Sequence, residues 1–244
     1  MNYKLLSSCL TILLTSFFIA KNSLSFNPIR FHCPNYMLNS YLYLILSMSI
    51  LISTIFTLEH IKVDLNKLFA GNTRFLLLIL SFILIIGVTI ISPNYFLTKH
   101  ILWLLFIAVS GIFLYPLLVE NKLAFYHTAS TTFLLIAVLT LVTFIKPDMI
   151  KDSYFMPLFI GLITLLISRI SSNLLSNWGF IDNNKFGKIY SYITIILFSL
   201  FTMYDTKEII KNAENCINPD YINQSLNLFL NSLNIFTSSY DINN

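Results

Sequence analysis

Long apolar stretches alternate with short polar breaks along most of the chain. Six of these stretches cover residues 36–58, 75–92, 101–119, 123–145, 154–175 and 189–204. A helix rises about 1.5 Å per residue, so about 20 apolar residues cross the hydrocarbon core of a bilayer. The stretches are too long and too continuous for the alternating strands of a membrane β-barrel. The pattern predicts six membrane-spanning helices, joined by connections too short to hold a second domain.

Residues 5–20 form a shorter apolar stretch near the beginning of the chain. Lys4 precedes it, Lys21 follows it, and no acidic residue occurs before Glu59. A charged start and a short apolar core are typical of a targeting leader, although the small-residue cleavage pattern is missing. Residues 1–34 are therefore predicted to be either a leader or an extra membrane span.

Amides follow one face of the last apolar segment, residues 221–240. They occur at Asn223, Asn227, Asn231 and Asn234, and the four, four and three spacing places them in one stripe along a helix. A helix lying on the membrane surface normally carries Lys or Arg on its polar face, and this segment has neither. We therefore predict a buried seventh helix whose amides bond to neighbouring helices.

The composition agrees with a membrane protein. Hydrophobic residues make up 56% of the 244 residues and charged residues 11%, against about 25% charged residues in soluble domains. This composition excludes an ordinary soluble enzyme and a disordered tail, and the scattered net charge of +4 excludes a nucleic-acid binder. The odd number of cysteines (Cys9, Cys33 and Cys216) without C-x-x-C spacing predicts neither a disulfide framework nor a metal site. We predict an all-α helical bundle in the membrane.

Two charged residues in the predicted spans are candidates for function, because a charge within a membrane bundle is costly. Arg169 lies deep in the fifth span and Asp205 directly follows the sixth. The alternatives are structural: Asp205 as a hydrated acid at a helix end, and Arg169 as a side chain reaching the interface or pairing with an acid.

Enzyme motifs do not fit the sequence. Ser110-Gly111 has Ala108 where the first glycine of a serine-protease turn belongs, and Glu59-His60 reverses the order of a zinc-protease motif. The four histidines have no metal-ligand spacing. We expect no catalytic residue, no cofactor and no metal site.

Two motifs near the end of the chain carry a resemblance to a known family. Residues 198–209 read F-S-L-F-T-M-Y-D-T-K-E-I, and Asp220-Tyr221-Ile222 precedes S-L-N-L-F-L-N-S-L-N-I-F at residues 225–236. They resemble the end of the sixth helix and the seventh helix of the Bax inhibitor-1 family. Weaker similarities occur at residues 100–106 with Gly111, at Ala124 with residues 128–129, and at residues 160–163 with 173–174.

The resemblance implies a single membrane domain over residues 35–240, with seven helices and the last helix in the centre. It also implies a pH-gated cation leak, chiefly for Ca²⁺, in which two aspartates share a proton and latch the pore. Asp205 matches the first aspartate, but Asn231 stands where the second belongs. We therefore predict a modified gate with a blunted or shifted pH response. Asn227 and Asn234 would line the route, and Arg169 is a candidate counter-charge.

Two functions remain open at this point. One is a passive leak for Ca²⁺ or another cation across a lipid bilayer. The other is a non-conducting protein that regulates cell death or stress signalling by binding membrane-protein partners. Either fits a multi-pass protein of an endomembrane, an organelle membrane or a bacterial plasma membrane. Basic residues do not predict the orientation, because seven flank the spans on one side and six on the other.

Overall fold

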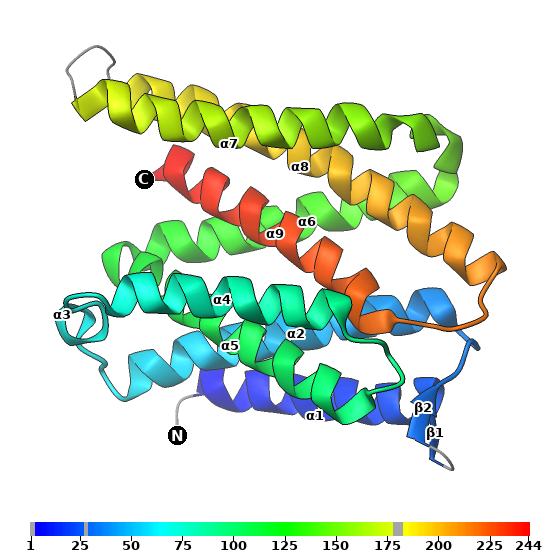
Figure 1. Cartoon of the computed structure of the whole chain (residues 1–244). Helices are drawn as coiled ribbons and strands as arrows, with labels where there is room; N and C mark the ends of the chain where they lie inside the picture. The colour runs from blue at the N-terminus through cyan, green and yellow to red at the C-terminus, as the bar shows by residue number, and fades with distance from the viewer. Residues whose placement is uncertain (1–2, 27–28, 178–182) are drawn as a thin grey trace. The chain divides into compact units, whose positions relative to one another are not determined.

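The computed structural model describes residues 3–26, 29–177 and 183–244, and they are almost entirely helical (Figure 1). The helices are α1 (Tyr3–Ser23), α2 (Tyr36–His60), α3 (Leu65–Leu68), α4 (Thr73–Ile90), α5 (Phe96–Glu120), α6 (Lys122–Ile145), α7 (Phe155–Asn177), α8 (Asn183–Glu214) and α9 (Tyr221–Asn243). Two three-residue strands, β1 (Leu24–Phe26) and β2 (Ile29–Phe31), form an antiparallel pair. The two 3-10 turns are Pro147–Met149 and Asp152–Tyr154. The predicted all-α class is confirmed.

Each of the six predicted spans lies on one long helix, in order α2, α4, α5, α6, α7 and α8. Within the described part of the chain, these six and α1 are the helices long and apolar enough to cross a membrane. The amides of α9 keep that helix out of this group. A polytopic helical membrane protein is thus confirmed, with α1 as the seventh helix that meets the length and composition required.

Two helices extend further than the apolar stretches. α5 begins at Phe96, so Lys99 and His100 are helical rather than part of a polar break. α8 continues past Asp205 to Glu214, and the sequence has no helix-breaking residue before Asn218-Pro219. The predicted break at residues 177–188 contains the end of α7 and the beginning of α8, and its residues 178–182 lie outside the described residues.

The chain forms two compact units. Unit 1 comprises the described residues up to Glu120 together with residues 212–226, and unit 2 comprises the described residues of 121–211 together with 227–244. α8 and α9 each contribute to both units, so neither unit is one continuous stretch of the chain.

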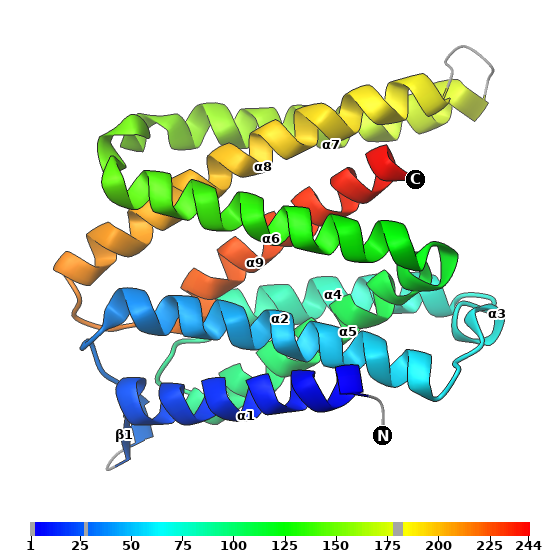
Figure 2. The same ribbon diagram turned by 180° about the vertical axis from the view of Figure 1, so that it is seen from behind.

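In unit 1, α1 packs along α2, and α2 and α4 each pack on α5 (Figure 2). Gly111 of α5 allows a close approach to α2, because a Cβ atom at this position would lie 2.9 Å from Cβ of Thr54. α4 buries only Leu84 and Val88, and most of its other apolar side chains are exposed. Such an apolar surface suits contact with lipid.

In unit 2, Ile136 of α6, Phe198 of α8 and Ile235 of α9 form a buried apolar cluster. In this unit α9 buries Leu228, Phe229 and Ile235 completely, although it carries an amide in nearly every turn. This burial matches the prediction that α9 is a buried helix rather than one lying on the membrane surface.

Candidate functional site

Asp205 and Asn231 lie in direct contact in unit 2. The amide of Asn231 donates a hydrogen bond from Nδ2 to Oδ2 of Asp205, with a distance of 2.6 Å. Asn231 is buried and Asp205 is partly buried. A carboxylate with little access to water requires such donors, because desolvation disfavours its charged form. The contact joins the two family motifs that the sequence places 26 residues apart.

A second acidic side chain lies one helical turn beyond Asp205. Residues three apart share a face of a helix, so Glu208 follows Asp205 on the same side of α8. Glu208 is partly buried, and its Oε1 lies 3.7 Å from Nζ of Lys211. Thr202 and Thr206, on either side of Asp205 in the sequence, are fully buried. This segment of α8 therefore combines buried hydroxyl groups with two acids.

The remaining amides of α9 do not join the Asp205–Asn231 pair. Asn227 is exposed. Asn234 donates from Nδ2 to the carbonyl oxygen of Leu230 in its own helix at 2.8 Å. Asn223, in unit 1, donates to the carbonyl oxygen of Thr89 at 3.3 Å. The stripe predicted from spacing is present along the helix, but its members have different partners.

Arg169 belongs to α7 and lies near the beginning of α8. Its guanidinium carbon is 4.9 Å from the centre of the Tyr190 ring, a cation–π distance. Tyr190 and Asp205 are 15 residues apart on one helix, which corresponds to about 22 Å along its axis. The structure therefore brings Arg169 to an aromatic ring at the beginning of α8, and not to Asp205.

Asp205 and Glu208 supply carboxylate oxygens on the same side of α8, and the amide nitrogen of Asn231 faces Asp205. Carboxylate and amide oxygens are the ligands that hard cations such as Ca²⁺ prefer, and a tight calcium site supplies six to eight of them. In the described part of the chain, no group of three or more His, Cys, Asp or Glu side chains is arranged to hold a metal ion.

A buried ion pair in unit 1 was not anticipated from the sequence. Lys99 of α5 is fully buried, and its Nζ donates to Oδ2 of Asp220 at 2.5 Å and to the carbonyl oxygen of Ile91 at 2.8 Å. Asp220 directly precedes α9 and opens the Asp220-Tyr221-Ile222 motif. The signal available in the sequence was an unexplained lysine beside an apolar span and an unexplained aspartate in a family motif.

The prediction that the cysteines form no disulfide was wrong. Cys33 and Cys216 are bonded, with Cα atoms 5.8 Å apart, although they are 183 positions apart in the sequence. Spacing along the chain carries no information about such a pair, because the fold alone brings its loops together. Cys9 is free and exposed.

Aromatic side chains surround the beginning of α9 in unit 1. The hydroxyl of Tyr221 donates to the carbonyl oxygen of His32 at 2.5 Å, and its ring stacks on Tyr43. Tyr43 in turn hydrogen-bonds to Nε2 of His100 at 2.9 Å. Phe31 of β2 contacts the rings of Tyr43 and Tyr221 edge to face. These contacts, the ion pair and the disulfide all fix the segment that leads into α9.

Comparison with known proteins agrees with the resemblance carried by the two motifs that contain Asp205 and Asn231. Residues 34–241 match the family described as inhibitor of apoptosis-promoting Bax1. This range includes both Asp205 and Asn231. The chain is also similar to the growth hormone-inducible transmembrane protein of Rattus norvegicus, with 28% identity over 145 residues. That alignment covers 57% of this chain and 41% of the relative, so less than half of the relative's own length is matched. Because the family match extends over most of the sequence and the fold is a polytopic helical bundle, the chain belongs to the Bax inhibitor-1 family of multi-pass membrane proteins.

Proposed function

We propose that the protein is a passive leak for Ca²⁺ or a similar cation, with the Asp205–Asn231 pair as its gate. The observation that carries the proposal is the 2.6 Å hydrogen bond between these two side chains of α8 and α9. While the bond is made, the amide occupies one carboxylate oxygen that a cation would otherwise contact. A cation passing Asp205 would replace that amide with its own charge.

The chemistry of the pair supports a gate that responds weakly to pH. A charged Asp205 accepts a hydrogen bond from the amide nitrogen of Asn231. A neutral Asp205 can donate its proton to the amide oxygen after the amide group turns over. The pair can therefore persist in both protonation states, whereas two aspartates at this distance would need a shared proton.

Calcium flux into proteoliposomes that contain the full chain tests this proposal. The wild type is expected to leak Ca²⁺, and Asp205→Asn is expected to reduce the leak, because the only carboxylate in the pair is lost. Asp148→Asn is a matched control, since Asp148 is an exposed residue of the connection between α6 and α7. No flux from well-folded wild type, or equal flux from Asp205→Asn, would contradict the proposal.

A non-conducting role, in regulating cell death or stress signalling through membrane-protein partners, is the second candidate. It is favoured by the replacement of the second aspartate with Asn231, since an amide–carboxylate bond also serves as a purely structural link between helices. Under this alternative, Asp205→Asn would leave flux at the level of empty liposomes and would change only the stability of the protein. The flux assay and a thermal unfolding measurement on the same preparations therefore separate the two functions.

A further inference from the structure

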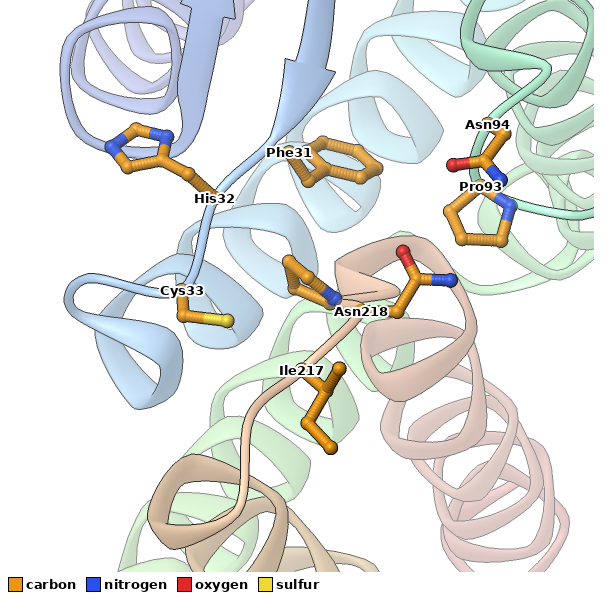
Figure 3. A pocket seen from close by; sticks show the side chains of 8 residues that line it. Phe31, His32, Cys33, Pro93, Asn94, Ile217 and Asn218 are labelled. Atoms are coloured by element: carbon orange, nitrogen blue, oxygen red, sulfur yellow. The ribbon is translucent and has the colours of Figure 1, made fainter.

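The disulfide in unit 1 joins two loops that are distant in the sequence. Cys33 lies between β2 and α2, and Cys216 lies between α8 and α9. The Cys33 side chain points towards the segment that carries Ile217 and Asn218 (Figure 3). The bond therefore ties the α8–α9 loop, residues 215–220, to the chain just before α2.

The disulfide lies where a soluble reagent can reach it. Cys33 and Cys216 are both only partly buried. An open cavity of about 310 Å³ is lined by Cys33 and, from the α8–α9 loop, by Ile217, Asn218 and Pro219. The side chain of Ile217, directly after Cys216, is 94% exposed. Thiol–disulfide exchange requires access of a thiolate to one of the two sulfur atoms, and Cys33 lines this open cavity.

We propose that the Cys33–Cys216 disulfide is a redox-responsive tether of the α8–α9 loop and that this end of unit 1 faces an oxidising compartment. A dithiol reductant would attack one sulfur, release the other as a thiolate and then close its own disulfide. Two electrons and two protons pass to the protein, which gains two thiols, while the reductant becomes a disulfide. A protein or small-molecule disulfide reverses the reaction. Disulfides form and persist in oxidising compartments, which is why the bond indicates the side of the membrane.

Reduction would release only part of the segment. Asp220 keeps its ion pair with buried Lys99, and Tyr221 keeps its hydrogen bond to the carbonyl oxygen of His32. The residues freed are those between the end of α8 at Glu214 and the proline at position 219. The tether thus controls the mobility of the loop without detaching the beginning of α9.

The tether also supplies an orientation that the basic residues do not. Lys99 is buried within α5, so it is not a loop charge. Without it, the basic residues that flank the spans number six on one side of the membrane and six on the other. The disulfide-bearing loops and the α4–α5 loop, which lines the same cavity through Pro93 and Asn94, would face the oxidising side. The α2–α4 connection, which carries Lys67 and follows the opposite end of α2, would face the reducing side.

The first test is the redox state of the cysteines in native membranes. Membranes are treated with iodoacetamide before extraction and without reductant, and the peptides are analysed by mass spectrometry. Cys33 and Cys216 are expected as a linked, unalkylated pair. Recovery of both residues as alkylated thiols would overturn the proposal.

The second test measures the tether directly. A Glu-specific protease can cleave after Glu214, which lies at the end of α8 beside the loop. In the purified full-length protein, dithiothreitol is expected to increase this cleavage several-fold, and Cys216→Ser should show the increase without reductant. Cys9→Ser is the control and should behave as the wild type. Equal cleavage rates with and without reductant would exclude a tether.

The third test concerns orientation and uses single thiols in the Cys9→Ser background, where Cys33 and Cys216 stay bonded. Tyr95→Cys places an exposed thiol in the α4–α5 loop, and Lys67→Cys places one on the opposite side of unit 1. In sealed vesicles of known sidedness, an impermeant maleimide should label Tyr95→Cys only from the oxidising side and Lys67→Cys only from the other. The reverse pattern would overturn the proposed orientation. None of the three tests depends on whether the protein conducts ions.

Discussion

Lys99 and Asp220 form a buried ion pair between residues that are 121 positions apart in the chain. The ammonium group is fully buried, and 22% of the Asp220 side chain is exposed. The pair connects α5 to the residue that precedes α9, within unit 1. A fully buried lysine is tolerated here because two oxygen atoms, one of them on a charged carboxylate, accept hydrogen bonds from its ammonium group.

Asp220→Asn is predicted to destabilise the protein more than Lys99→Met. The asparagine variant leaves a buried ammonium group without a counter-charge, and breaking a buried pair in this way costs about 3–5 kcal/mol. The methionine variant leaves a carboxylate that water can still reach. The thermal unfolding midpoint of the purified protein in detergent should fall furthest in Asp220→Asn.

The double variant Lys99→Met with Asp220→Asn tests whether the two residues act as a pair. Its loss of stability should be clearly smaller than the sum of the two single losses, because no unpaired charge remains. Additive losses would show that each side chain contributes through other contacts instead.

Apolar runs and one amide stripe were sufficient to predict most of the helices, and the resemblance to family motifs indicated one contact of the candidate site. The bilayer explains this success, because each membrane span has to be apolar over its whole length. The motif match placed Asp205 and Asn231 on neighbouring helices, and the hydrogen bond between them is present in the structure. The amide stripe predicted the burial of α9 but not the partners of Asn227 and Asn234, which depend on neighbouring side chains.

The contacts that the sequence did not reveal are the long-range ones in unit 1. The Cys33–Cys216 bond and the Lys99–Asp220 pair each join segments separated by more than a hundred residues. A single sequence contains no periodicity that connects such positions. Lys99 was assigned to a polar break, because a charge next to an apolar run normally marks a helix end, and only its partner explains why α5 includes it.

Gly111→Ala is predicted to destabilise the contact between α2 and α5. The added methyl group would lie 2.9 Å from Cβ of Thr54 and 3.2 Å from the carbonyl oxygen of Leu51. Neither atom can move unless the backbone of α2 moves with it. Overpacking of this kind costs about 1–3 kcal/mol. A fall in the thermal unfolding midpoint of the purified variant would be the expected result.

Gly161→Ala is the matched control for the glycine prediction. Its new methyl group would meet the two methyl groups of Leu197, Cδ1 at 3.1 Å and Cδ2 at 3.9 Å, which end a flexible side chain that can turn away. We expect a much smaller shift in the unfolding midpoint than for Gly111→Ala. Equal shifts would mean that the close approach at Gly111 is not what limits side-chain size there.

Lys207→Met is predicted to loosen the connection between α6 and α7 in unit 2. Nζ of Lys207 donates to the carbonyl oxygen of Ile150 at 2.7 Å and lies 2.8 Å from Oδ1 of Asp152. Hydrogen exchange of the amides in residues 146–154 should become faster in this variant. Lys211→Met is the control, because Lys211 lies 3.5 Å from the same aspartate but is 52% exposed, where ion pairs contribute little. An equal effect of both substitutions would contradict an anchoring role for Lys207.

Asn231→Asp is predicted to give the gate a steeper response to pH. Asn231 Nδ2 and Asp205 Oδ2 are 2.6 Å apart, so an aspartate at position 231 would place two carboxyl groups in contact. Two carboxylates at this distance cannot both stay charged without a large cost, and the pair would hold one shared proton. Loss of that proton as the pH rises would separate the groups, whereas the wild-type amide keeps its bond to the charged carboxylate. Calcium flux measured between about pH 6 and pH 8 should therefore change more sharply in Asn231→Asp than in the wild type. Asn66→Asp, an exposed substitution in α3, controls for the added charge. If both variants follow the wild-type profile, the Asp205–Asn231 pair is a structural link rather than the gate.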